Sequence, residues 1–144
     1  MSSLKPESLP YFRELVQIRP ILSIHQSARR GKQVFSHGCC NDTTRIVAAL
    51  TGLEQVGGFY TYPNFTREQK KELSIQHIEH AWNHDKDRGL YIDLTLCQFD
   101  EYPKIAIIEP SSGILMPNAK LTKKQNEMEL EGVVRVIEFL NHST

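Results

Sequence analysis

One stretch of the sequence constrains the fold of this chain more than any other: HAWNHDKDRGLYIDLT, which begins at His80. Two short runs that contain apolar residues, HAWN and LYID, stand on either side of a charged segment that ends in glycine. This pattern predicts a β-hairpin. If Asp85–Arg88 forms a four-residue loop, the register of the two strands places His80 opposite Asp93. The same register places Trp82 opposite Tyr91.

The predicted hairpin brings together a histidine and an aspartate that can act in acid–base chemistry. Residues directly opposite each other in an antiparallel pair project to the same face, with Cβ atoms about 4.5–5.5 Å apart. A carboxylate next to an imidazole fixes the orientation of the ring and favours its charged form. We therefore expect His80 and Asp93 to meet on one face. Trp82 and Tyr91 share that face and are candidates for lining a substrate groove.

A cysteine doublet, Cys39 and Cys40, stands at the start of a predicted helix over residues 39–50. Apolar residues recur there at a spacing of three to four, and Gly52 stands where the helix would end. A protonated histidine and the N-terminus of a helix both lower the pKa of a nearby thiol. A cysteine, a histidine and an aspartate are therefore candidates for a nucleophile, its base and the group that orients the base.

The remaining patterns predict an α+β fold in which N-terminal helices pack on a small antiparallel sheet, in a single domain over residues 1–144. A capping-box pair, Thr66 with Gln69, begins a helix that runs to about Ile75. A second such pair, Thr122 with Gln125, begins a last helix with an apolar stripe over residues 130–140. Further elements are expected as a helix over residues 11–18 and strands over residues 59–62, 104–109 and 113–116.

Composition argues against several classes of partner. The 144 residues include 17 basic and 17 acidic side chains, so there is no global positive field that would attract nucleic acid or an anionic membrane. No apolar run approaches the roughly 20 residues of a membrane span, and the N-terminal sequence lacks the pattern of a signal peptide. We therefore expect a cytoplasmic protein that binds neither nucleic acid nor membrane.

The cysteines and histidines predict neither a disulfide framework nor a metal site. Cys39, Cys40 and Cys97 are too few for such a framework, which favours a reducing compartment. His77, His80 and His84 would need one continuous helix to bind zinc together, and the predicted hairpin excludes it. We expect no metal and no cofactor.

Around these residues the sequence resembles the papain-like superfamily, in particular its compact Cys-His-Asp branch, which includes bacterial papain-fold toxins and protein-glutamine deamidases. The resemblance covers roughly residues 33–99. It rests on a Gly-Cys pair before a helix that ends in LTG, on HAW at His80, and on IDLTLCQF from Ile92. Transglutaminases and arylamine acetyltransferases use a similar order of cysteine, histidine and aspartate.

The resemblance implies a papain-like fold and a thiol-dependent amide hydrolase. The cysteine would attack the carbonyl carbon, His80 would relay the proton and Asp93 would orient His80. Gln33, six residues before Cys39, would contribute to an oxyanion hole. Cys39 is favoured over Cys40, because the positions four, seven and eleven residues after it form the more coherent helix face.

The sequence leaves the exact reaction open. Hydrolysis of a glutamine side chain would be deamidation, hydrolysis of a backbone or isopeptide bond would be proteolysis, and transfer to an amine would be transglutamination. In each case the partner is a protein substrate that offers a glutamine or a peptide amide. An effector-type enzyme could be delivered by a dedicated secretion system. A papain-like binding module without turnover is the alternative from another class.

Overall fold

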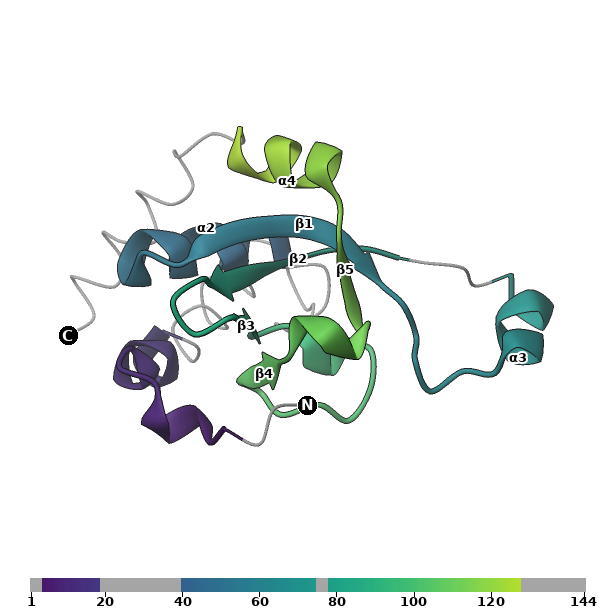
Figure 1. The fold of residues 1–144 in the computed structure, drawn as a ribbon, viewed down its shortest axis with the longest axis horizontal. Helices are drawn as coiled ribbons and strands as arrows, with labels where there is room; N and C mark the ends of the chain where they lie inside the picture. Colours follow the sequence, from purple (N-terminus) through teal and green to yellow (C-terminus); the bar gives the residue numbers. More distant parts are fainter. Residues whose placement is uncertain (1–3, 19–39, 75–77, 128–144) are drawn as a thin grey trace, which may run out of the picture.

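The structure, a computed structural model, describes residues 4–18, 40–74 and 78–127 of the chain. Within these ranges, five strands form one antiparallel sheet in the order β4-β3-β2-β1-β5 (Figure 1). The strands are β1 (Glu54–Tyr60), β2 (Ile78–Asp85), β3 (Leu90–Asp93), β4 (Ala106–Ile108) and β5 (Leu115–Pro117). The two longest, β1 and β2, pair with each other along the middle of the sheet. The expected α+β class with an antiparallel sheet is therefore confirmed.

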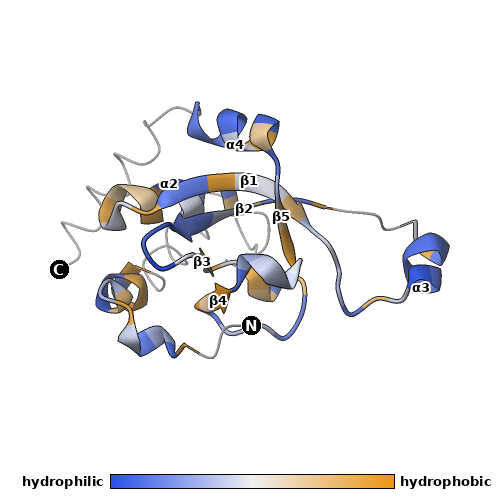
Figure 2. Cartoon of the chain, viewed as in Figure 1, coloured by the Kyte–Doolittle hydropathy of each residue, from blue (hydrophilic) through white to orange (hydrophobic). Residues whose placement is uncertain are grey.

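Helices lie around this sheet and at the end of one long connection. Residues 12–18 are helical, and α2 (Cys40–Thr51) packs on β2, whereas α4 (Ala119–Asn126) packs on β1. α3 (Arg67–Glu72) has no buried residue and lies far from the sheet, at the right of Figure 1. The hydropathy colours in Figure 2 follow this arrangement, since α3 and most of α4 are hydrophilic and β4 is hydrophobic. Three short 3-10 turns complete the described elements: η1 (Pro6–Ser8), η2 (Leu96–Gln98) and η3 (Pro110–Ser112).

The sheet is buried on both faces. One cluster of buried side chains includes Leu15, Val47 and Ile92, and the other includes Trp82 and Ile108. Successive residues of a strand point to opposite faces, so all four residues of β3 can be buried only if both faces are covered. The sequence around His80 thus forms part of the interior.

The register of the β2–β3 hairpin differs from the predicted one by two residues. Asn83 pairs with Ile92, whereas the prediction paired it with Leu90. Because side chains alternate with a period of two, a shift of two residues leaves each side chain on its expected face. His80 and Asp93 therefore share a face as predicted, but as diagonal neighbours rather than directly opposite each other.

The loop explains this shift. It spans residues 86–89, so that Asp85 belongs to β2 and Gly89, at φ 64°, closes the turn. The Asp85 carboxylate accepts hydrogen bonds from the backbone N–H of Arg88 at 3.1 Å and from the hydroxyl of Tyr11 at 2.6 Å. The latter bond ties the N-terminal segment to the end of the hairpin.

Of the two helix-capping pairs that the sequence predicts, the structure contains one. The capping box of Thr66 and Gln69 is present at the start of α3, as predicted. The prediction that Thr122 caps the last helix is wrong, because α4 begins at Ala119 and Asn118 accepts the N–H of Leu121 at 3.0 Å. The predicted apolar stripe over residues 130–140 lies outside the described residues.

β1 starts earlier than predicted and includes the glycine pair, Gly57 and Gly58. A Cβ on Gly57 would lie 2.5 Å from the backbone oxygen of Leu121, and a Cβ on Gly58 would collide with the backbone oxygen of Met116. The Thr122 hydroxyl accepts the N–H of Gly57 at 3.1 Å and donates to its carbonyl at 3.0 Å. The two glycines therefore let α4 and β5 approach the backbone of β1 more closely than any side chain would allow.

We predict that Gly57→Ala destabilises the protein by about 1–3 kcal/mol, because the backbone of α4 has to move away from β1. The free energy of unfolding is measured by urea titration. The matched control is Gly113→Asn, at a position with φ 74° and open space around the missing Cβ, where asparagine adds only backbone strain and the loss of stability should be smaller. Equal stability of Gly57→Ala and the wild type would show that α4 does not rest on this glycine.

Candidate active site

His80 and Asp93 form a buried hydrogen-bonded pair in the sheet. Nε2 of His80 lies 2.6 Å from Oδ2 of Asp93, and the two residues are only 4% and 1% exposed. The second carboxylate oxygen, Oδ1, accepts the backbone N–H of Thr95 at 2.8 Å and its hydroxyl at 3.3 Å. Asp93 is thus held by the turn that follows β3, and its Oδ2 atom faces the imidazole.

Two aromatic rings pack against the His80 imidazole. Phe99 meets it edge to face with ring centroids 5.0 Å apart, and Trp82 stacks on it at 6.0 Å. Nδ1 of His80, the ring nitrogen that does not contact Asp93, is also buried.

Cys40, the first residue of α2, lies beside His80. Burial of the ring lowers the pKa of His80, but the charge and hydrogen bond of Asp93, followed by those of the Cys40 thiol, raise it to about 10. His80 is therefore cationic at neutral pH, between a carboxylate on one side and a sulfur on the other. This ordered row can supply a nucleophile, a proton and a group that orients the base.

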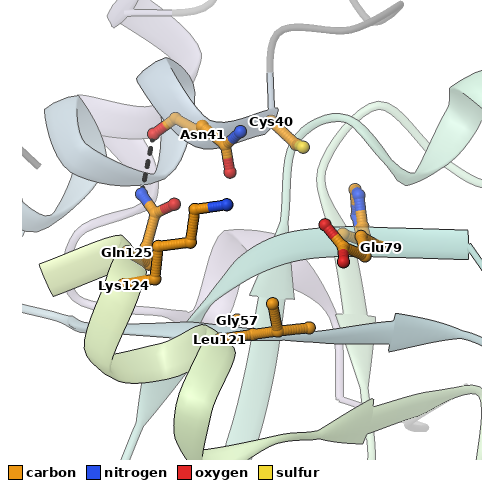
Figure 3. A pocket seen from close by; sticks show the side chains of 8 residues that line it. Cys40, Asn41, Gly57, Glu79, Leu121, Lys124 and Gln125 are labelled. Carbon is orange, nitrogen blue, oxygen red and sulfur yellow. Dashed lines mark hydrogen bonds between the residues drawn. The ribbon is translucent and has the colours of Figure 1, made fainter.

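The sulfur opens into a pocket of about 340 Å³, which we call the Cys40 pocket (Figure 3). Figure 3 shows Asn41 and Lys124 on one side of it and Glu79 on the other. The pocket lies where α2, α4 and the central strands meet. Its lining residues are Cys40, Asn41, Gly57, Glu79, His80, Leu121, Lys124 and Gln125.

Buried amides hold the two helices in place around the pocket. The side-chain N–H₂ of Gln125 donates to the backbone oxygen of Asn41 and to the side chain of Gln55, both at 2.9 Å. On β2, the amide of Asn83 donates to the backbone oxygen of Thr44 at 3.0 Å. The start of α2, and with it Cys40, is therefore positioned by both α4 and the sheet.

The structure brings together three of the predicted catalytic residues, Cys40, His80 and Asp93. Two others, Cys39 and Gln33, lie outside the described residues. Trp82 and Tyr91 are 1% and 6% exposed, and neither lines the Cys40 pocket. Their rings do contact each other, with centroids 5.4 Å apart, but as buried neighbours rather than on an open surface.

Sequence reasoning missed the contribution of α4 to the pocket. Lys124 and Gln125 lie in α4, whose contact with β1 depends on the distant glycine pair and therefore left no local signal. Glu79 directly precedes His80, and no sequence pattern indicated that it would line the pocket. The role of Thr95 had a weak signal, since a threonine two residues after an aspartate can bond its carboxylate.

The described residues contain no group of three or more His, Cys, Asp or Glu side chains placed to hold a metal ion. In the same ranges, none of the helices has the length and apolar character that crossing a membrane requires.

Comparison with known proteins identifies no relative. A scan against models of protein families found no match, and searches of curated proteins and of solved structures found none either. The resemblance to the papain-like superfamily therefore stays a prediction.

We predict that the charge of His80 makes stability depend on pH in the alkaline range. Its pKa of about 10 in the folded protein exceeds the ordinary value of about 6.5, so protonation stabilises the folded state. This contribution is complete below about pH 6.5 and is lost as the pH rises to about 10. In that window the free energy of unfolding should fall by up to about 1.4 kcal/mol per pH unit.

The measurement is urea unfolding at several pH values, followed by the fluorescence of Trp82, the only tryptophan of the chain. Subtracting the same curve for His80→Gln removes the titration of all other groups. Parallel curves for the two proteins between pH 6.5 and 10 would contradict the prediction.

Proposed function

We propose that this protein is a thiol-dependent amide hydrolase, in which Cys40 is the nucleophile, His80 the acid–base group and Asp93 the group that orients His80. The class of reaction that we infer is deamidation of a glutamine side chain in a protein substrate. The observation that carries the proposal is the row of Asp93, His80 and Cys40, with the 2.6 Å hydrogen bond at one end and the pocket at the other.

The first half of the reaction forms a thioester. The Cys40 sulfur, as thiolate, attacks the carbonyl carbon of the amide, and the C=O bond becomes a tetrahedral oxyanion. Backbone N–H groups in the first turn of α2 have no intrahelical partner and are available to stabilise that charge. The C–N bond then breaks as His80 gives its proton to the departing nitrogen, which leaves as ammonia.

The second half returns the enzyme to its starting state. The now neutral His80 takes a proton from water, and the resulting hydroxide attacks the thioester carbon. The C–S bond breaks, the carboxylic acid leaves, and the thiolate is restored beside the imidazolium. Asp93 keeps the ring oriented and stabilises its charge in both halves, while Thr95 holds the carboxylate.

Cys40 is proposed as the nucleophile, although the helix-face pattern favoured Cys39. The pattern does not decide between the two cysteines, because α2 buries residues of both series, including Thr43 and Thr44, while Leu50 is 37% exposed. Cys40 lines the pocket together with His80, and its thiol contributes to the raised pKa of that residue.

We predict that iodoacetamide alkylates Cys40 rapidly at pH 6.5, and that His80→Ala slows this reaction by at least about tenfold. The imidazolium stabilises the thiolate, which is the reactive form, and Asp93→Asn should slow alkylation in the same direction. Rates are measured by mass spectrometry of the peptide that contains the doublet, with fragmentation to separate Cys39 from Cys40.

The control is His84→Ala. His84 lies on the same strand, and its Nδ1 is 3.8 Å from Glu54 rather than beside the thiol, so alkylation should keep the wild-type rate. If His84→Ala slows the reaction as much as His80→Ala does, or if Cys39 reacts first, the proposed roles are wrong.

The reaction itself is tested by intact-mass analysis of protein substrates after incubation with the enzyme. Deamidation predicts a gain of about 1 Da per modified glutamine, because an amide is exchanged for an acid. The gain should be absent with Cys40→Ala. Fragmentation of the substrate would instead identify a peptidase, and addition of an amine would identify an acyltransferase.

A further inference from the structure

The Cys40 pocket continues into a second hollow along α4. This second hollow has a volume of about 620 Å³ and shares Glu79, Leu121 and Lys124 with the first. We call the two adjoining hollows together the α4 groove. Its lining includes the proposed nucleophile at one hollow and Phe59 and Glu127 at the other.

Lysines dominate the wall of the groove that α4 provides. Lys120, Lys123 and Lys124 all line it, and their spacing of three and four residues places them on one side of the helix. Lys123 lies 3.8 Å from Glu127, which neutralises part of its charge. No acidic side chain of the described residues lies within ion-pair distance of Lys120 or Lys124.

Lys124 is the lysine that belongs to both hollows. Figure 3 shows its side chain extending into the Cys40 pocket, toward the space between Asn41 and Glu79. A cation in this position can pair with a carboxylate that lies within a few residues of an amide bound at Cys40. Glu79 on β2 and Glu127 after the end of α4 are the acidic groups of the lining, and the three lysines along α4 outnumber them.

We propose that the α4 groove selects protein segments in which acidic residues flank the target amide. Lys124 pairs with the carboxylate nearest to that amide and Lys120 with one farther along. The apolar parts of Phe59 and Leu121 contact the remainder of the segment. This inference rests on the proposed function for the identity of the target group, but the binding that it describes does not require turnover.

Charge and shape favour an acidic peptide as the occupant. The ammonium groups offer point charges for carboxylates, and the groove also contains two apolar side chains that a purely electrostatic site would not need. The chain as a whole has a net charge of zero, so attraction of an acidic segment has to come from this local concentration of lysines.

The test measures binding to Cys40→Ala, which cannot turn over its substrate. Three fluorescein-labelled peptides share one central glutamine and differ in the flanking residues, which are glutamate, serine or lysine. Fluorescence anisotropy should give the tightest binding for the glutamate peptide. Lys124→Gln in the same background should weaken that binding about fivefold, and added salt should weaken it as well.

Lys71→Gln is the matched control, because it removes the same charge from α3, far from the groove (Figure 1). It should leave the affinity for the glutamate peptide unchanged. Thermal unfolding of each variant verifies that the exposed substitutions keep the fold. Equal affinity for the three peptides, equal losses in the two lysine variants, or tighter binding of a single-stranded oligonucleotide would each overturn the inference.

Failure of this inference is distinguishable from failure of the proposed function. Turnover of all three peptides by the wild type at equal rates would overturn the acidic preference and support the hydrolase. Tight, Lys124-dependent binding of the glutamate peptide without turnover would support the groove and contradict the hydrolase.

Discussion

The hydrogen bond between His80 and Asp93 is the interaction on which the rest of the site depends. Both groups are withdrawn from water, and a buried charge is tolerated only beside a partner that compensates it. Breaking such a pair by removing one member typically costs about 3–5 kcal/mol, because the other charge is left alone. The turn after β3, with Thr95 on the carboxylate and Phe99 on the imidazole, is arranged around this requirement.

The site combines parts of the chain that are far apart in sequence. The sheet provides the histidine and the aspartate, α2 provides the thiol, and α4 provides one wall of the pocket. Two amide side chains, Asn83 and Gln125, link these parts through bonds to backbone oxygens of α2. Because backbone positions are fixed in this way, Cys40 is placed by the fold rather than by its own side-chain contacts.

The sequence predicted the parts of this arrangement that depend on local pattern. Alternation along the hairpin placed His80 and Asp93 on one face. This prediction was correct although the register was wrong by two residues, because a shift of two residues leaves every side chain on the same face. The error itself came from Asp85, whose bonds to Tyr11 and Arg88 extend β2 by one residue. A contact with a residue 74 positions away cannot be deduced from the turn sequence.

The pocket could not be predicted from the sequence either, because it too depends on contacts between residues that are far apart in the chain. Its α4 wall exists because Gly57 admits the helix, and a glycine pair in isolation indicates a turn as readily as a close approach. The cysteine doublet posed a different difficulty, since α2 buries residues of both of the helical series that were compared, Thr43 and Ile46 in one and Thr44 and Val47 in the other. Periodicity can choose between faces only when one of them is exposed.

In the proposed hydrolase, the glycine under α4 also limits how mutation can change the range of substrates. One wall of the pocket is main chain at residue 57, where any side chain would collide with the backbone of α4. Change in the lining is thereby left to side chains such as Asn41, Glu79 and the exposed positions of the eight-residue α4. Related chains with the same core would be expected to differ in substrate preference mainly through these side chains.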